Sequence, residues 1–227
     1  MTLTIIVPAY NERDTILEAI RRVEEADLGP AVTREILVVD DCSRDGTREL
    51  LRAVPGIRLL EHARNQGKGM AIRTALAEAT GEVVVIQDAD LEYDPADFRA
   101  MLEPIRYGKT AVVYGSRFLK GRPRMRLANY IANRLLAWSA TLLFRRRLTD
   151  EATCYKMFRT DVLRAMDLRA ERFEFCPEVT AKALRAGYRI LEVPISYRAR
   201  SIAEGKKITW RDGLDAFWTL AKYRFLR

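Results

Sequence analysis

Short apolar runs alternate with segments of helical periodicity through the first half of the chain. Residues 3–7 are apolar and mostly β-branched, which is typical of a buried strand. Residues 13–26 then repeat apolar side chains at the spacing of one helix face, and Gly29-Pro30 marks the end of that helix. The same alternation predicts further strands at 35–39, 57–60, 83–86 and 111–114, and further helices at 46–53, 70–79 and 95–105.

Strands and helices that alternate in this way predict an α/β fold with a mostly parallel sheet covered on both faces. In such sheets ligands bind beyond the carboxyl ends of the strands. We therefore expect four segments to share one edge of the sheet: 8–12, 40–47, 88–94 and 115–118. Polar and turn-forming residues gather in these four segments.

The second half of the chain is less regular. Its patterns predict amphipathic helices at 127–144 and 209–224, a helix at 177–186, and strands at 153–158 and 189–193. The helix at 127–144 approaches membrane-spanning length but contains Arg134, and an arginine near the centre of a spanning helix costs about 2.5–3.5 kcal/mol. Aromatic residues with flanking arginines favour a helix that lies in a membrane interface, although packing on the domain is the other interpretation.

Charge narrows the choice of partners. The 227 residues carry a formal net charge of +8, which favours anionic partners such as nucleotide phosphates, acidic lipid surfaces or nucleic acid. Three cysteines without metal-ligand spacing argue against a disulfide framework or a zinc site. Because the first residues also lack the basic region of a signal peptide, we expect the protein to act on the cytosolic side.

The segment Asp88-Ala89-Asp90 is the most informative in the chain. It follows a buried strand directly, and two acids one residue apart on an extended segment point the same way. Adjacent carboxylates repel each other unless they hold a cation or share a proton. Such oxygen ligands suit Mg²⁺ or Mn²⁺, with Glu92 as a third ligand. A solvated acidic loop is the alternative.

Two further segments of the predicted edge are candidates for nucleotide binding. Asp40 and Asp41 follow a strand and could accept hydrogen bonds from a base or ribose, although helix capping explains part of this acidic cluster. The glycine-rich segment at 62–69 precedes a helix and lacks the P-loop pattern, so a structural turn is as good an interpretation as a phosphate contact. His62, the only histidine, is a weak candidate for a catalytic base.

Taken in order, the motifs resemble those of the family 2 glycosyltransferases, in the branch that contains dolichol-phosphate mannosyltransferase and the bacterial polyprenyl-phosphate sugar transferases. The resemblance spans nearly the whole chain. It rests on 8–12, Asp40 to Thr47, Asn65 to Gly69, Asp88-Ala89-Asp90, Gly115-Ser116-Arg117, Leu148-Thr149-Asp150, Thr153 to Lys156, Val193 to Tyr197 and Glu204 to Lys207.

This resemblance implies a GT-A (Rossmann-like) three-layer fold in a single domain over 1–227. Residues 1–118 would bind the nucleotide sugar and metal, and residues 119–227 would bind the acceptor through interfacial helices. The nucleotide sugar would contact Pro8, Tyr10, Glu12, Asp40, Asp41, Lys68, Asp88, Ala89 and Lys206. The chain departs from the family pattern at Cys176, where an acid is usual, and at Glu151-Ala152, and both departures concern the acceptor side.

The expected reaction is a metal-dependent, inverting transfer of a sugar from a nucleotide-diphosphate sugar to a polyprenyl phosphate. Asp90, Arg117, Arg200 and Asp150 are the candidate catalytic residues, and Arg117, Arg124 and Arg126 would hold the acceptor phosphate. A phosphate acceptor is already ionised near neutrality, which fits a chain without an obvious histidine base. Asp150 could equally have a structural capping role.

The sequence is also compatible with other functions. A soluble acceptor is the nearest alternative, followed by a nucleotidyltransferase that would release pyrophosphate. A nucleic-acid-binding module fits the basic stretches, but the acidic edge of the predicted sheet argues against it. GDP-mannose and UDP-hexoses such as UDP-glucose or UDP-N-acetylglucosamine all remain candidate donors.

Overall fold

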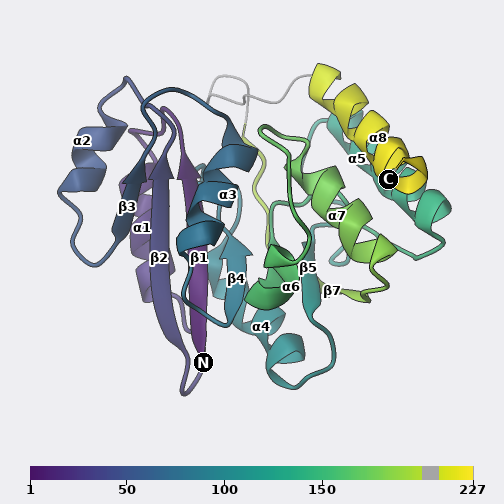
Figure 1. Cartoon of the computed structure of the whole chain (residues 1–227), viewed down its shortest axis with the longest axis horizontal. Coiled ribbons are helices and arrows are strands. Elements are labelled where there is room, and N and C mark those ends of the chain that lie inside the picture. Colours follow the sequence, from purple (N-terminus) through teal and green to yellow (C-terminus); the bar gives the residue numbers. More distant parts are fainter. Residues whose placement is uncertain (201–209, 227) are drawn as a thin grey trace.

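The computed structural model describes residues 1–200 and 210–226 and contains one seven-stranded mixed sheet (Figure 1). The strand order is β3-β2-β1-β4-β6-β5-β7. Only β6 runs antiparallel to its neighbours, so the predicted mostly parallel sheet is confirmed. The strands are β1 (Thr2–Ala9), β2 (Thr33–Asp40), β3 (Arg58–Glu61), β4 (Val83–Ile86), β5 (Val112–Ser116), β6 (Lys156–Arg159) and β7 (Ile190–Pro194).

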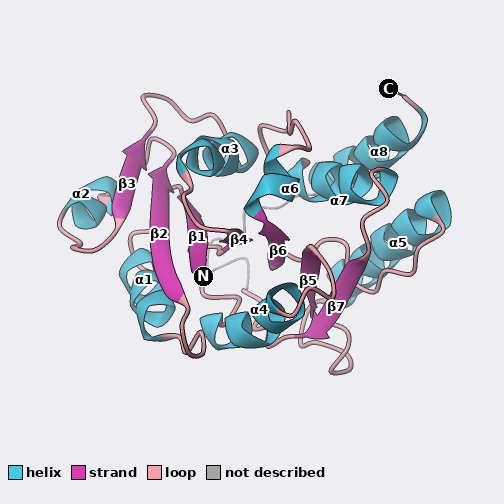
Figure 2. Ribbon diagram, turned by 60° about the horizontal axis from the view of Figure 1, so that its bottom comes forward, coloured by secondary structure: helices cyan, strands magenta, loops and turns pink. Residues whose placement is uncertain are grey.

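Helices cover both faces of this sheet, which gives the three layers expected from the sequence. Figure 2 shows α1 and α4 on one side of the sheet and α3, α6 and α7 on the other. The helices are α1 (Ile16–Glu25), α2 (Thr47–Arg52), α3 (Lys68–Glu78), α4 (Phe98–Arg106), α5 (Leu127–Phe144), α6 (Thr160–Arg164), α7 (Phe175–Arg185) and α8 (Trp210–Phe225).

The predicted elements occur with shifts of a few residues, and two differences have clear causes. The strand expected at 153–158 begins only at Lys156, because the residues before it form the connection that carries Asp150 and Cys154 to the edge of the sheet. The helix expected at 95–105 begins as a 3-10 turn, in which Asp94 caps Ala96. The short helix α6 was not predicted; five residues give too little periodicity to detect.

The carboxyl ends of β1, β2, β4 and β5 lie at the same edge of the sheet. β1 pairs in parallel with both β2 and β4, and β5 regains that direction because it and β4 each pair antiparallel with β6. Pro8 fits inside β1 because it lies beyond Ile6, the last residue paired with β4, and its missing N–H breaks no ladder bond there. The predicted grouping of four polar segments at one edge is confirmed.

Candidate functional site

The turn after β4 carries the two candidate metal ligands. Gln87 is buried and fixes this turn, because its amide donates to the backbone carbonyl of Asp88 at 2.8 Å while its oxygen accepts from the Tyr155 hydroxyl at 2.6 Å. Ala89 points into the core. Asp88 and Asp90 are both partly exposed, on either side of this buried residue.

Asp90 lies in an unusually unfavourable environment for a charged carboxylate. Burial, followed by the negative charges of Asp88 and Glu92, raises the pKa of Asp90 to about 7. In the described part of the chain no lysine or arginine forms an ion pair with it, and its carboxylate accepts a hydrogen bond from the backbone N–H of Glu92 at 3.1 Å. A carboxylate pair with too little positive charge nearby fits Mg²⁺ or Mn²⁺, which commonly take one or two carboxylates together with substrate phosphates.

Glu92 does not join this pair as the predicted third metal ligand. One of its carboxylate oxygens accepts from the Tyr197 hydroxyl at 2.9 Å, and the other accepts from the backbone N–H of Arg200 at 2.6 Å. Across residues 1–200 and 210–226, no group of three acidic, histidine or cysteine side chains is arranged to hold a metal ion. The structure therefore supports a site of two carboxylates, with Glu92 fastening the segment after β7.

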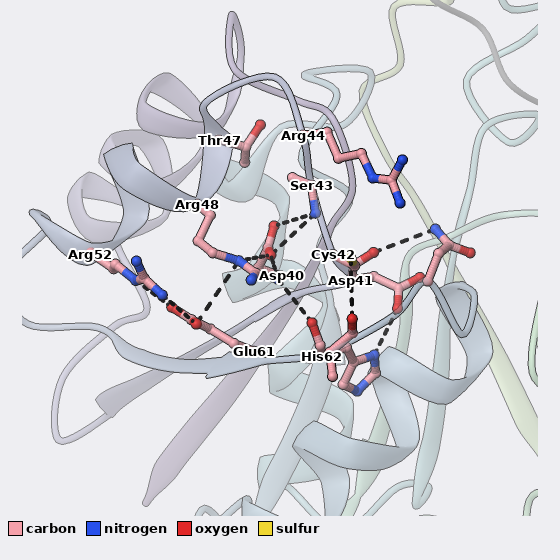
Figure 3. A network of polar contacts seen from close by, with 12 residues as sticks. Asp40, Asp41, Cys42, Ser43, Arg44, Thr47, Arg48, Arg52, Glu61 and His62 are labelled. Carbon is pink, nitrogen blue, oxygen red and sulfur yellow. Dashed lines mark hydrogen bonds and ion pairs between the residues drawn. The ribbon is translucent and has the colours of Figure 1, made fainter.

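The acids at the end of β2 are fully engaged with the protein, as Figure 3 shows. Asp40 has no exposed surface and forms an ion pair with Arg48 at 2.6 Å. Its carboxylate is thus not available to a base or ribose, which contradicts the predicted direct contact. Asp41 is 3% exposed and accepts hydrogen bonds from His62 at 2.7 Å and from two backbone N–H groups. Its carboxylate is therefore also occupied by contacts within the protein.

Those two backbone groups belong to the turn that leads into α3. Asp41 accepts from the N–H of Gln66 at 2.8 Å and of Gly67 at 2.7 Å. Gly67 has φ +93, and a Cβ there would lie 2.4 Å from the carbonyl oxygen of Glu171, so only glycine fits. The turn therefore sits tightly between β2 and the 170–172 segment, and it directs Lys68 to Asp88, where Nζ and Oδ1 lie 2.5 Å apart.

Of the donor-side residues predicted at the end of β1, Glu12 contacts Arg200, the last described residue before 210. Glu12 forms an ion pair with Arg200 at 2.7 Å, across 188 positions of sequence. Pro8 is half-buried in β1, and Tyr10 is 36% exposed at the end of that strand. Lys206, the remaining predicted contact, lies outside the described residues.

Arg117 and Asp150 form a buried ion pair, and this changes the roles expected for both. The guanidinium donates to the two carboxylate oxygens at 2.7 Å each, and the backbone N–H of Arg117 donates at 3.0 Å. Burial would lower the pKa of Arg117, but Asp150 raises it well above its usual range. With Asp150 at 0% exposure and Arg117 at 7%, the predicted catalytic and acceptor-phosphate contacts are not supported for this pair, which instead anchors the end of β5.

The other two predicted acceptor residues remain accessible. Arg124 and Arg126 are exposed in the segment that precedes α5, and no carboxylate in the described ranges pairs with either one. Arg122, close by, stacks over Tyr130 at 5.0 Å.

Sequence reasoning missed several side chains near the carboxylate pair. Cys154 is buried, with its sulfur 3.6 Å from Lys68 Nζ, and Tyr155 fixes Gln87 as described above. Tyr197 connects Glu92 to Arg117, whose guanidinium carbon lies 5.0 Å from the centre of its ring. The sequence motifs at 153–156 and 193–197 contain these residues, but neither motif indicates which partners the side chains contact.

Comparisons with known proteins place these features in a family. The family model "Glycosyl transferase family 2" matches residues 4–166. The undecaprenyl-phosphate mannosyltransferase of Micrococcus luteus is 31% identical over 221 residues, which cover 91% of this chain and 87% of that protein. The dolichol-phosphate mannosyltransferase of Pyrococcus furiosus is 28% identical over 216 residues, and there the match spans 91% of this chain but only 59% of the relative.

Solved structures agree on the fold. Glucosyl-3-phosphoglycerate synthase of Mycobacterium tuberculosis, in complex with Mn²⁺, UDP and its product, matches 100% of this chain and 81% of its own with a TM-score of 0.73 at 20% identity. A mannosyltransferase of Pyrobaculum calidifontis, in complex with GDP-Man and Mn²⁺, matches 85% of this chain and 54% of its own with a TM-score of 0.59 at 25% identity. The predicted GT-A fold is confirmed.

Replacing Asp150 with asparagine should destabilise the protein by about 3–5 kcal/mol, because Arg117 would lose its buried counter-charge. Urea unfolding measures the change. Asp167→Asn is the matched control, since the Asp167–Arg169 pair is exposed and should contribute less than about 1 kcal/mol. A loss below about 1 kcal/mol for Asp150→Asn as well would contradict the anchoring role of the pair.

The stability of the metal-free protein should fall as the pH rises from about 3.9 to about 7, because the Asp90 carboxyl is then ionised in the unfolded chain but still protonated in its buried, acidic surroundings. A raised folded pKa adds stability that is complete below the unfolded value of about 3.9 and is lost as the pH rises through the folded pKa. Thermal unfolding in EDTA, compared between the native protein and Asp90→Asn from pH 5 to pH 8.5, isolates this contribution. A constant difference between the two proteins over this range would show that Asp90 has an ordinary pKa.

Proposed function

Because the chain belongs to glycosyl transferase family 2, it is a glycosyltransferase, and we propose that it transfers a sugar from a nucleotide-diphosphate sugar to a polyprenyl phosphate. The observation that carries the proposal is the Asp88–Asp90 pair at the carboxyl edge of the sheet, deficient in positive charge and beside Lys68. The proposed donor is GDP-mannose or a UDP-hexose.

The donor diphosphate is proposed to bind at this pair together with Mg²⁺ or Mn²⁺. When bound, the cation would neutralise charge that develops on the leaving diphosphate. Asp88 and Asp90 would hold the cation, while Lys68 and Arg200 would supply positive charge to the diphosphate. The Pyrobaculum mannosyltransferase, which contains GDP-Man and Mn²⁺, supports this assignment.

We propose direct displacement with inversion at the anomeric carbon of the sugar. An oxygen of the acceptor phosphate forms the new bond to that carbon, and the bond to the nucleoside diphosphate breaks. The acceptor needs no base because a phosphate is already ionised near neutrality. His62 could not readily serve as one, since its two ring nitrogens contact Asp41 at 2.7 Å and Thr74 at 3.0 Å inside the protein.

The names of the relatives support a lipid-linked acceptor, since they specify undecaprenyl phosphate and dolichol phosphate. On this chain, Arg124 and Arg126 are exposed at the start of α5 and are proposed to attract the acceptor phosphate. Arg117 would contribute only indirectly, because its guanidinium is already paired with Asp150 and fixes the end of β5 beside the site.

The exposed faces of α5 and α8 are proposed to lie on the cytosolic surface of a membrane. The two helices lie side by side in both views (Figures 1 and 2). The side chain of Arg224 in α8 donates to the backbone carbonyl of Leu143 in α5 at 2.8 Å. Within the described ranges, no helix is both long and apolar enough to cross a membrane. The two helices expose large apolar residues instead, namely Leu127, Ile131, Leu135, Trp138 and Leu142 in α5, and Leu214, Trp218 and Phe225 in α8.

Such a face fits the interface of an anionic bilayer. Apolar side chains on one side of a helix enter the boundary between headgroups and acyl chains, and nearby arginines attract anionic lipids. Arg145, Arg146 and Arg147, which follow α5 directly, and the exposed Arg126 before it supply this charge. A polyprenyl phosphate held in the same bilayer would then meet the catalytic edge without leaving the membrane.

Release of nucleoside diphosphate should require both a divalent cation and a polyprenyl phosphate. An assay over GDP-mannose, UDP-glucose and UDP-N-acetylglucosamine, with and without Mn²⁺ and a short polyprenyl phosphate, tests the proposal. Asp90→Asn should lower turnover at least about 100-fold, the scale of losing one key electrostatic group, while the variant stays folded. Release that does not respond to the lipid would indicate a soluble acceptor, and release of pyrophosphate from nucleoside triphosphates would indicate a nucleotidyltransferase.

Removing Trp138 and Trp218 together should weaken binding to vesicles that contain phosphatidylglycerol about tenfold or more. The reason is that burial of one large apolar side chain contributes roughly 1.5–3 kcal/mol, and 1.4 kcal/mol corresponds to a factor of ten. Cosedimentation of Trp138→Ser/Trp218→Ser measures the effect, with Tyr107→Ser as the control, because Tyr107 is similarly exposed but follows α4. Equal binding by the double variant and the control would exclude the α5–α8 face as the membrane contact.

A further inference from the structure

Lys68 occupies the position of a cation at the carboxylate pair. Its ammonium lies 2.5 Å from Asp88 Oδ1, and the two side chains are 18% and 19% exposed. Within residues 1–200 and 210–226, it is the only lysine or arginine whose ion pair involves Asp88 or Asp90. The ammonium therefore already supplies, next to Asp88, the kind of positive charge that a bound metal ion would supply.

The backbone around Lys68 holds the ammonium in this place. Asp41 fixes the N–H groups of Gln66 and Gly67, and the Met70 N–H donates to the Glu171 carbonyl at 3.0 Å. At Gly69, a Cβ would lie 2.6 Å from the carbonyl oxygen of Ala170, so the turn cannot move away without losing this packing. Lys68 thus extends to Asp88 from a fixed starting point at the first turn of α3.

We propose that Lys68 competes with the divalent cation for Asp88 and thereby couples metal binding to donor binding. This inference rests on the proposed donor site. In the protein alone, the ammonium satisfies Asp88 and repels an incoming cation. A nucleoside diphosphate gives Lys68 a new partner in its phosphate oxygens, so Asp88 becomes available when the diphosphate arrives. Metal and diphosphate therefore strengthen each other's binding, as reciprocity requires for any two coupled ligands.

The test measures Mn²⁺ binding directly, by the electron paramagnetic resonance signal of free Mn²⁺, so it does not depend on turnover. Mn²⁺ is titrated into the full chain alone, and then with saturating UDP or GDP. Calorimetry gives the affinity for the same nucleotide with and without Mn²⁺. The proteins are the native chain, Lys68→Met, Lys68→Arg and the control Lys109→Met, which removes one exposed positive charge far along the chain from the turn.

Lys68→Met should bind Mn²⁺ alone at least about fivefold more tightly than the native protein, a factor at the lower end of typical coupling between sites. Its affinity for the metal-free nucleotide should fall, and the increase in Mn²⁺ affinity caused by nucleotide should shrink at least about fivefold. Lys68→Arg should keep most of the coupling because it keeps the charge, and Lys109→Met should match the native protein.

Unchanged Mn²⁺ affinity and unchanged coupling in folded Lys68→Met would overturn the inference while leaving the proposed function intact. Coupling that falls equally in Lys109→Met would also overturn it, because net charge alone would then explain the effect. A native protein that binds no Mn²⁺ with either nucleotide would overturn the inference together with the proposed metal-dependent function.

Discussion

Repulsion among the acids at the carboxyl edge of the sheet is the constraint on which the rest of the site depends. Parallel strands bring the ends of β1, β2 and β4 together, and each of these ends carries acidic residues. Most of these acids obtain a cation or N–H groups from elsewhere in the chain. Asp90 is the exception, since it forms no ion pair with any described lysine or arginine, and its pKa is raised to about 7. The uncompensated charge at this one position is the reason that we propose this edge as the binding site for a cation.

The compensating partners explain how the fold builds the edge. Asp40 forms an ion pair with Arg48 of α2, and Asp41 accepts hydrogen bonds from two backbone N–H groups of the turn before α3. Both acids therefore fix the position of neighbouring segments. The same turn then delivers Lys68 to Asp88. An acid that looks like a ligand contact in the sequence can therefore serve the site indirectly, by placing the residue that makes the contact.

Local features of the site could be predicted from the sequence, and contacts between distant segments could not. The buried strand at 83–86 and the acids that follow it were identified from neighbouring residues, and the helix at 127–144 matches the observed bounds of α5. By contrast, Arg117 and Asp150 are 33 positions apart, and nothing in either motif indicates that the two residues neutralise each other. The contacts of Glu92, expected as a third metal ligand, were equally hidden in the sequence, because its carboxylate accepts from the Tyr197 hydroxyl and the Arg200 backbone N–H.

These long-range contacts also join the two halves of the chain at the edge of the sheet. The segment that follows β7 is fastened to the segment after the carboxylate pair, since Ser196 donates to Asp97 at 2.6 Å and Tyr197 donates to Glu92. Arg200 then reaches Glu12, at the end of β1. A negatively charged diphosphate at this edge would compete with Glu12 for Arg200 just as it would compete with Asp88 for Lys68. Because Lys68 and Arg200 both have carboxylate partners within the protein, donor binding would replace two internal ion pairs with contacts to the diphosphate.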